Sequence, residues 1–490
     1  MSTEQRAKLS TGLVGLDEVL HGGLIPHRTY LIRGEAGTGK TILGLHYLIA
    51  GVNKGENCLF ITFSEAEEQL RQNAKSLNLD TGGIDFLDLS PSSEKFTAEE
   101  TYDVFHPSEV EQEPIMDAIR EEVSATEPSR VFIDAITILR HLTSDQYQFR
   151  QQILSLSQFF ADQGATILFT SEKSSKNPDE DLQFMADGII QLGRSDRRRT
   201  LKVSKFRGSD FRQGNHSLKI KGEGLSVYPQ LISNKDEKEY KGGKLSSGVP
   251  EVDEMLHGGL EIGTVTLFTG PSGVGKTSLA LQFAKEAAGR GNRTVVYNFD
   301  ESKNLLNSRS EAINIPVERM IEGGNLSIEE VKPFQLTDNQ FAQRVREEIE
   351  KNETEIVVLD SLNGYNLSIK GERLDKSLYN LCQYFRNMGT TTILTNEVSK
   401  ITGEFRASDL DITVVADNVV FFRYLEIRGQ LRKAIGVLKK RVSDFERTLR
   451  EFEITEHGIK VGAPMENLRG ILSGQPEWDG GTNNGEREKR

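Results

Sequence analysis

Two short stretches of the chain have the spacing of glycine, lysine and threonine that binds the phosphates of a nucleotide. Residues 34–41 read GEAGTGKT and residues 270–277 read GPSGVGKT, and both fit the P-loop pattern G-x-x-x-x-G-K-[ST]. Glycines let backbone N–H groups approach phosphate oxygens, the lysine reaches the terminal phosphates, and the threonine hydroxyl binds Mg²⁺. Because the pattern occurs twice, the sequence predicts two sites for a nucleoside triphosphate. The predicted phosphate-binding residues are Gly34, Gly37, Thr38, Gly39, Lys40 and Thr41 in the first loop and Gly270, Gly273, Val274, Gly275, Lys276 and Thr277 in the second, with Thr41 and Thr277 as magnesium ligands.

An aspartate ends a further apolar run in each half of the chain. Asp134 ends the run 131–134, and Asp360 ends the run 356–360. A carboxylate at the end of such a strand would emerge beside the P-loop, where a Walker B aspartate holds the magnesium ion. We therefore predict that Asp134 and Asp360 complete the two nucleotide sites.

A pair of residues that includes at least one acid also follows the first strand after each P-loop helix. The pair is Ser64-Glu65 in the first half and Asp300-Glu301 in the second. The carboxyl ends of strands in an open α/β sheet face the ligand crevice. A carboxylate there can accept a proton from the attacking water or hydroxyl, or align it. Glu65, Asp300 and Glu301 are the predicted catalytic acids.

A Lys-x-Arg pair occurs late in each half. Lys205 and Arg207 form the first pair, and Lys439 and Arg441 form the second. Phosphoryl transfer needs extra positive charge in its transition state, and an arginine from a neighbouring subunit often supplies it. Because the pairs are far from the P-loops in sequence, they are predicted to reach a neighbour's nucleotide, which implies a ring.

The elements that must position these residues are repeated as well. Short strand-like runs, 29–33 and 264–269, precede the P-loops, and helical patterns, 42–50 and 278–288, follow them. Further apolar runs recur at matching places in both halves. Continuous β-branched runs separated by helical segments predict a mainly parallel sheet flanked by helices. We expect two such α/β domains, residues 1–236 and 237–478, followed by a disordered tail, residues 479–490.

Bulk composition limits the classes of function. The 490 residues carry 60 basic and 73 acidic side chains, a net charge of −13, which does not favour non-specific binding of nucleic acid. No apolar run is long enough for a membrane span, and the N-terminus lacks a secretory signal. The two cysteines, Cys58 and Cys382, read as buried thiols rather than a disulfide framework. A cytoplasmic protein without a membrane partner is expected.

With these motifs, the chain resembles the KaiC family of circadian clock ATPases and autokinases from residue 11 to about residue 476. The segment 11–24 parallels the segment 247–260, each containing Asp-Glu-x-x-x-Gly-Gly, and residues 423–429 (RYLEIRG) and 466–476 (ENLRGILSGQP) also match. The resemblance implies two tandem RecA-like domains and a homohexamer of two stacked rings with ATP and Mg²⁺ between subunits. It implies slow hydrolysis and a KaiB-like partner for the first ring, and autophosphorylation on adjacent Ser and Thr in the second, in clock-like or stress signalling.

The sequence departs from the family pattern at two functional places. The paired glutamates of the family become Ser64-Glu65 and Asp300-Glu301, so hydrolysis in the first half is slow or depends on Glu65. The adjacent phosphoacceptors fall on Thr413-Val414, with Ser408 at the place of a nearby third hydroxyl. A one-site switch at Thr413 is therefore expected in place of a two-site cycle. The short stretch beyond residue 476 argues against a KaiA-type activator.

Two other readings stay open. The chain could be a RecA-like DNA-dependent ATPase, although its charge and the lack of alternating basic and aromatic residues argue against this. It could also be a nucleotide-gated scaffold with little catalysis, which Ser64 favours for the first half. DNA-stimulated hydrolysis would support the first reading. The second would be supported if neither the loss of Glu65 nor the loss of Glu301, tested separately, lowers turnover.

Overall fold

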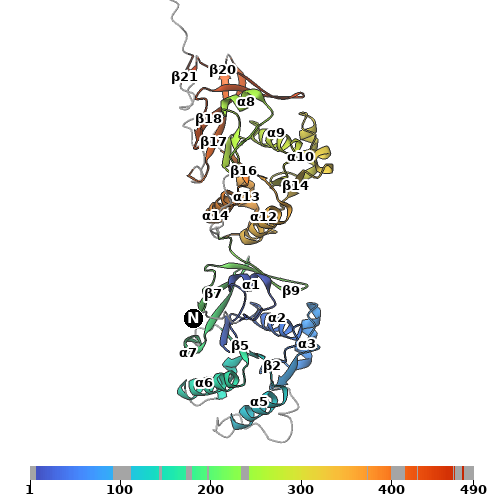
Figure 1. Cartoon of the computed structure of the whole chain (residues 1–490), viewed down its shortest axis with the longest axis vertical. Helices are drawn as coiled ribbons and strands as arrows, with labels where there is room; N and C mark the ends of the chain where they lie inside the picture. Colours follow the sequence, from blue (N-terminus) through green and yellow to red (C-terminus); the bar gives the residue numbers. More distant parts are fainter. Residues whose placement is uncertain are drawn as a thin grey trace, which may run out of the picture. The chain divides into compact units, whose positions relative to one another are not determined.

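The two P-loops lie in separate compact units of the computed structural model (Figure 1), Met1–Gln230 and Leu231–Arg490. The structure describes residues 7–91, 112–142, 146–172, 179–195, 198–232, 242–371, 374–398, 414–427, 429–466, 468–469 and 477–478. Leu231 already belongs to a hydrophobic core of the second unit. The predicted boundary at residue 236 and the predicted tail 479–490 lie outside the described residues.

The first unit is a nine-stranded sheet with the P-loop strand near its centre. Its order is β3-β2-β4-β5-β1-β6-β7-β8-β9. The strands from β3 to β6 pair in parallel, and β6 to β9 return as antiparallel hairpins. The elements are α1 (Val14–Val19), β1 (Thr29–Gly34), α2 (Lys40–Val52), β2 (Cys58–Thr62), α3 (Glu67–Ser76), β3 (Asp85–Asp88), α5 (Gln112–Thr126), β4 (Arg130–Asp134), η2 (Ile136–Leu142), α6 (Gln146–Asp162), β5 (Thr166–Glu172), α7 (Glu180–Met185), β6 (Gly188–Ser195), β7 (Arg198–Phe206), β8 (His216–Lys221) and β9 (Gly224–Tyr228).

The second unit repeats this arrangement strand for strand. Its main sheet has the order β14-β13-β15-β16-β12-β17-β18-β19-β20, so β12 takes the place of β1. The elements are β10 (Lys244–Leu245), α8 (Pro250–Met255), β11 (Leu260–Glu261), β12 (Val265–Gly270), α9 (Lys276–Gly289), β13 (Thr294–Asn298), α10 (Lys303–Glu311), α11 (Val317–Glu322), β14 (Leu326–Glu330), α12 (Asp338–Asn352), β15 (Ile356–Asp360), α13 (Leu362–Ser368), α14 (Leu374–Asn387), β16 (Thr391–Glu397), β17 (Asn418–Ile427), β18 (Gln430–Lys440), β19 (Arg450–Thr455), β20 (Gly458–Pro464), β21 (Leu468–Arg469) and β22 (Glu477–Trp478). The prediction of two mainly parallel α/β units is confirmed.

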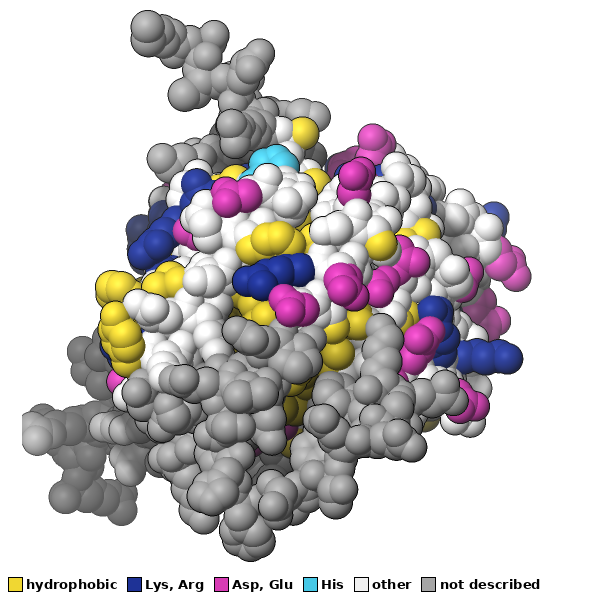
Figure 2. All heavy atoms as spheres, turned by 90° about the horizontal axis from the view of Figure 1, so that it is seen from below, with side chains coloured by type: hydrophobic (Ala, Val, Ile, Leu, Met, Phe, Trp, Pro, Cys, Tyr) yellow, Lys and Arg dark blue, Asp and Glu magenta, His cyan; other side chains and the backbone are white. Residues whose placement is uncertain are grey.

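The surface mixes charges of both signs. On the face shown in Figure 2, Lys and Arg side chains are interspersed with Asp and Glu among the described residues. No helix in the described part of the chain has both the length and the apolar character that crossing a bilayer requires. Cys58 and Cys382 are buried free thiols, as predicted.

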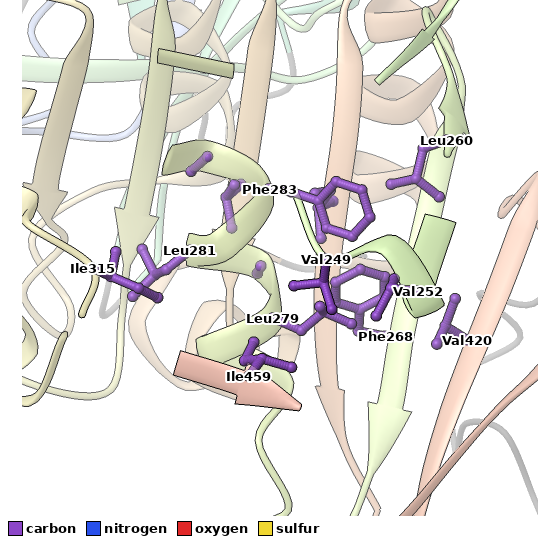
Figure 3. Packing of buried hydrophobic residues seen from close by; sticks show 14 of the residues in the cluster. Val249, Val252, Leu260, Phe268, Leu279, Leu281, Phe283, Ile315, Val420 and Ile459 are labelled. Carbon is purple, nitrogen blue, oxygen red and sulfur yellow. The ribbon is translucent and has the colours of Figure 1, made fainter. Parts of the chain in front are cut away.

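Helices cover both faces of each sheet because alternate strand residues point to opposite sides. In the second unit, Phe268 of β12 packs with the P-loop helix α9, whereas Leu267 belongs to the cluster on the opposite face. Figure 3 shows Phe268 and Phe283 among the residues that join β12 to α9. This packing fixes the P-loop between a buried strand and a buried helix.

Candidate functional site

Each P-loop holds its lysine against its own backbone. Lys40 Nζ donates to Gly34 O and Glu35 O at 3.0 and 3.1 Å, and Lys276 Nζ donates to Gly270 O and Pro271 O at 2.9 and 2.7 Å. Burial lowers the pKa of both lysines, and nearby carboxylates oppose that fall. The ammonium groups are therefore held at the loop, where terminal phosphates bind in proteins with this motif.

The last glycine of each loop is required by its conformation. Gly39 and Gly275 have φ values of +105° and +118°, which side-chain-bearing residues rarely adopt. A Cβ on Gly275 would also lie 2.6 Å from Phe452 of β19. These residues lead into α2 and α9, whose first backbone N–H groups have no partner within the helix and suit an anion.

The two predicted Walker B aspartates lie beside the P-loop threonines. Thr41 Oγ1 donates to Asp134 at 2.5 Å, and Thr277 Oγ1 donates to Asp360 at 3.0 Å. Both aspartates are buried, and each precedes a cis peptide bond. Burial raises the pKa of Asp360, and Asp300 adds to the rise, while bonds from Thr395 and Thr277 oppose it.

These oxygens fit a magnesium ion. A threonine hydroxyl and a carboxylate are the hard oxygen ligands that Mg²⁺ prefers, with the remaining positions left to water and phosphate. A bound cation would also offset the cost of keeping the Asp360 carboxylate charged while it is buried. Thr41 with Asp134, and Thr277 with Asp360, are the residues that would hold it.

The predicted catalytic acids differ in where they point. Asp300 Oδ1 lies so close to Gly364 that a Cβ added there would be 2.2 Å away. Its charge acts on both Lys276 and Asp360. Glu301 instead forms an ion pair with Arg309 of α10 at 2.7 Å. Burial raises the pKa of Glu301, and Arg309 opposes the rise. Asp300 is thus the acid whose charge acts on the P-loop lysine, while Glu301 is held by Arg309.

The first unit lacks the equivalent of Asp300. Ser64 is exposed at that position, and Glu65 accepts a bond from Asn73 Nδ2 at 3.3 Å. Thr62 holds the turn, because its hydroxyl donates to Glu65 O at 2.7 Å. In the second unit the buried Asn298 has the same task, donating to Glu301 O at 2.8 Å.

Sequence reasoning missed several residues around the P-loops. Thr170 and Thr395 donate to the two Walker B aspartates. Glu172 and Glu397 end the strands beside the P-loop strands, in register with Gly34 and Gly270. The repeated pattern Thr-x-Glu at the end of β5 and β16 is the signal that could have found all four.

The segment 423–429, which carried the family resemblance, supports the second P-loop. Tyr424 Oη donates to Ser272 O at 3.1 Å, and Lys433 Nζ on the paired strand β18 donates to Gly273 O at 3.0 Å. The antiparallel hairpin β17–β18 therefore braces the loop from the side.

The structure does not bring the Lys-x-Arg pairs to the P-loop of their own unit. Lys205 Nζ donates to Gln183 O and Phe184 O, both at 3.0 Å, and Lys439 Nζ donates to Ala416 O at 2.6 Å. The arginines are more than half exposed. Arg207 lies 3.6 Å from Asp187, and Arg441 lies 2.9 Å from Asp417.

The candidate phosphoacceptors Thr413 and Ser408 lie outside the described residues. Their neighbour Val414 is described and is 69% exposed. Phosphorylation at Thr413 therefore remains a prediction from the sequence.

Comparison with known proteins gives a consistent result over nearly the whole chain. A family model described as "ATPase: KaiC" matches residues 9–232 and again residues 245–466. The circadian clock oscillator protein KaiC of Acaryochloris marina is 27% identical over 484 residues, which cover 96% of this chain and 91% of that protein. The circadian clock protein KaiC3 of Synechocystis sp. is 27% identical over 493 residues, covering 97% and 96%. The circadian clock oscillator protein KaiC of Thermosynechococcus vestitus is 26% identical over 490 residues, covering 97% and 93%. Two P-loops with adjoining aspartates, on two sheets of identical strand order, agree with that double match, and the chain belongs to the KaiC family, with a RecA-like KaiC ATPase domain in each unit.

Proposed function

We propose that this chain forms a homohexamer of two stacked rings that binds and hydrolyses Mg·ATP at the seams between subunits and phosphorylates itself in the second domain. Each seam would combine the P-loop of one subunit with the Lys-x-Arg pair of its neighbour. The output is clock-like or stress signalling. The observation that carries the proposal is the position of the cation pairs on the sheets.

The P-loop and the cation pair lie at opposite ends of the neighbouring strands β1, β6 and β7. In the first unit, Gly188 at the start of β6 pairs with both Tyr30 of β1 and Phe206 of β7, while Gly34 at the P-loop pairs with Leu192. Four residues of strand separate the two levels, about 13 Å at roughly 3.3 Å per residue. Lys205 and Arg207 therefore lie beside the end of the sheet opposite their own P-loop, a position that leaves them for a neighbour's nucleotide.

Each arginine of the two pairs can leave its aspartate for a neighbouring subunit, because that aspartate has a second cationic partner. Asp417 accepts from Arg386 at 3.0 Å as well as from Arg441. Asp187 likewise lies 3.9 Å from Arg28. When Arg441 or Arg207 turns to a neighbouring subunit, the aspartate keeps a cationic partner, so neither the buried Asp417 nor the half-buried Asp187 is left without a compensating charge.

The site residues have separate tasks in hydrolysis. Backbone N–H groups of the P-loop and Lys276 hold the phosphates, and Thr277 with Asp360 would hold magnesium, which neutralises charge on the phosphate oxygens. Asp300 accepts a proton from the attacking water or hydroxyl, or aligns it. The neighbour's Lys439 and Arg441 stabilise the charge that develops on the transferred phosphoryl group.

Replacing Asp300 with serine, the residue of the first domain, should lower second-domain turnover by about 10²-fold. Turnover of this domain is the excess over a Lys276→Ala chain. Gly364→Ala should also lower it, because the added Cβ displaces the Asp300 carboxylate without removing it. Glu301→Gln, which removes the partner of Arg309, should have a smaller effect. A larger loss in Glu301→Gln than in Asp300→Ser would transfer the role to Glu301.

The assembly and the phosphorylation can be tested on one sample. Native mass spectrometry should show hexamers with Mg·ATP and smaller species without it. Phosphopeptide mapping of the same sample should then place phosphate on Thr413, and Thr413→Ala should remove it. A chain that stays monomeric in saturating Mg·ATP would contradict the ring, and equal labelling of Thr413→Ala would contradict the one-site switch.

The remaining partner assignments are proposals from the resemblance and the charge. A KaiB-like protein would bind the first ring, a KaiA-type activator is not expected, and the location would be cytoplasmic. The net charge of −13 and the mixed surface of Figure 2 argue against nucleic acid. Ser64 favours a nucleotide-gated scaffold as the second candidate for the first domain alone. Unchanged first-domain turnover after Glu65→Gln would support it.

A further inference from the structure

In both domains a lysine ammonium lies beside the cation pair, between the end of the first helix and the loop that follows the arginine. The two lysines come from non-equivalent positions in the repeat. In the first domain Lys8 Nζ donates to Leu20 O at 2.6 Å and to Ser209 Oγ at 2.8 Å. In the second domain Lys440 Nζ donates to Leu256 O and to Ser443 Oγ, both at 2.6 Å.

The acceptors are equivalent in the repeat. Leu20 and Leu256 are the residues that follow α1 and α8. Ser209 and Ser443 each stand two residues after the arginine of the cation pair. Each ammonium therefore ties the loop that follows Arg207 or Arg441 to the end of the first helix of its domain.

The residues around the two ammonium groups differ: an acidic partner is present in the second domain and apolar residues take its place in the first. Lys440 is the middle residue of the second cation pair, where the first domain has the buried Phe206, with Lys8 above its ring at 5.6 Å. Lys440 also donates to Glu261 Oε1 at 2.6 Å, and Ser443 donates to the same oxygen at 2.7 Å. The first domain has the apolar Ile25 in the place of Glu261, after the repeated Gly-Gly-Leu.

Lys440 is deeply buried and fully bonded. Its side chain is 0% exposed and that of Glu261 is 2% exposed. Its three donors match the three acceptors Leu256 O, Glu261 Oε1 and Ser443 Oγ. A charge is retained in such a place only with close partners, since desolvation is costly. The apolar pair Ile25 and Phe206 shows that this fold does not need the charge pair at these positions.

We propose that this ammonium is a positioning group for the cation pair: it fixes the loop after the arginine and so sets where Lys205 and Arg207, or Lys439 and Arg441, point. The inference rests on the proposed role of these pairs at the subunit seam. Lys8 and Lys440 touch no nucleotide in this scheme and act through the residues beside them.

The second domain retains a lysine that can take over the task. Lys244 stands twelve residues before Leu256, as Lys8 stands twelve before Leu20. Lys244 is exposed, and its Nζ donates to His257 O, one residue beyond Leu256. Once Lys440 is gone, Lys244 can move to Leu256 O and Ser443 Oγ and reproduce the arrangement of the first domain.

The test is therefore whether the effect of Lys244 depends on Lys440. The double variant of the full chain carries Glu261→Ile and Lys440→Phe, which introduce the residues that the first domain has at these positions. Lys244→Met is then added to the double variant and, separately, to the parent. We expect the double variant to keep second-domain kcat within about threefold. Adding Lys244→Met should then lower kcat at least tenfold with KM for ATP within twofold, whereas Lys244→Met in the parent should change kcat less than twofold.

Arg441→Ala, measured beside these variants, separates the inference from the proposed function. If Arg441→Ala lowers kcat but the triple variant keeps it, the positioning role is wrong and the seam stands. If Arg441→Ala has no effect, the seam itself is wrong. Should the triple variant fail to form hexamers, Lys8→Met in the Lys276→Ala chain gives the same test in the first domain. Its kcat should fall at least fivefold with KM unchanged, and Lys8→Arg should recover it. Parental turnover in Lys8→Met would overturn the proposal.

Discussion

Replacing Arg441 with alanine should lower ATP turnover by the second domain by about 10³-fold, the low end of the effect of an arginine supplied to a phosphoryl-transfer site. Binding of ATP should change little, because Arg441 lies at the end of the sheet away from its own P-loop and forms an ion pair with Asp417 at 2.9 Å. Turnover is measured as the excess over a Lys276→Ala chain, and nucleotide affinity by equilibrium binding. Arg207→Ala is the matched change in the first domain.

Mixing two chains that are each inactive in the second domain distinguishes a cation given to a neighbour from one used within the same subunit. An Arg441→Ala subunit keeps its P-loop, and a Lys276→Ala subunit keeps its arginine. In randomly mixed rings of equal parts, about a quarter of the seams join an intact P-loop to an intact arginine. We expect turnover to rise above the average of the separate proteins. No rise in demonstrably mixed hexamers would show that the arginine acts within its own subunit.

The nucleotide sites could be predicted from the sequence because their elements are local. A P-loop is one continuous stretch, and Asp134 and Asp360 end β-branched runs whose place in a parallel sheet follows from the pattern. Because the chain is a repeat, each of these motifs also occurs twice, so one half supports the assignment made in the other. These features depend on neighbours in sequence, which a single sequence displays.

The missed contacts depend on which side chains meet across distant strands. Thr170 and Thr395 bond the Walker B aspartates from the adjacent strand. The repeated Thr-x-Glu pattern marks the two threonines in the sequence, but it does not say which side chain each of them contacts. Gly364, four residues after Asp360, leaves the space that Asp300 occupies, whereas the residue four after Asp134 is Ile138. The ammonium beside the cation pair could not be predicted even from the repeat, since Lys8 and Lys440 are not equivalent residues. Only the folded structure shows that their ammonium groups bond equivalent acceptors.

Replacing Asp360 with asparagine should stabilise the second domain while abolishing its catalysis. The carboxylate is buried, and burial raises its pKa, with Asp300 adding to the rise. Keeping it charged at neutral pH therefore costs free energy that the neutral amide does not. Thr277 and Thr395 both donate to the same oxygen, Oδ1, so asparagine can keep both bonds. Without nucleotide, we expect the free energy of unfolding to rise by about 1–2 kcal/mol at pH 7.

The pH dependence gives the sign of this effect. An acid whose pKa is higher in the folded than in the unfolded state destabilises the fold while both forms are ionised. As pH falls through the raised folded pKa, the folded carboxyl takes up a proton first and the parent recovers stability. Recovery is complete below the unfolded value of 3.8. The advantage of Asp360→Asn should thus be largest at neutral pH and shrink in acid, as measured by urea unfolding between neutral pH and pH 4.

With Mg·ATP bound, the parent should become more stable to unfolding than Asp360→Asn. Ligand at about one hundred times its Kd adds about 2.7 kcal/mol to the parent, more than the expected gain of the variant, and Asp360→Asn loses most of this because the carboxylate that would hold magnesium is gone. Asp134→Asn is the control, since Thr41 donates to its Oδ2 and Thr170 to its Oδ1, and an amide there cannot accept both bonds. It should lose activity without the gain in stability. A nucleotide-free Asp360→Asn protein less stable than its parent would show that the carboxylate is held by the fold itself, and that its burial does not reserve a place for a cation.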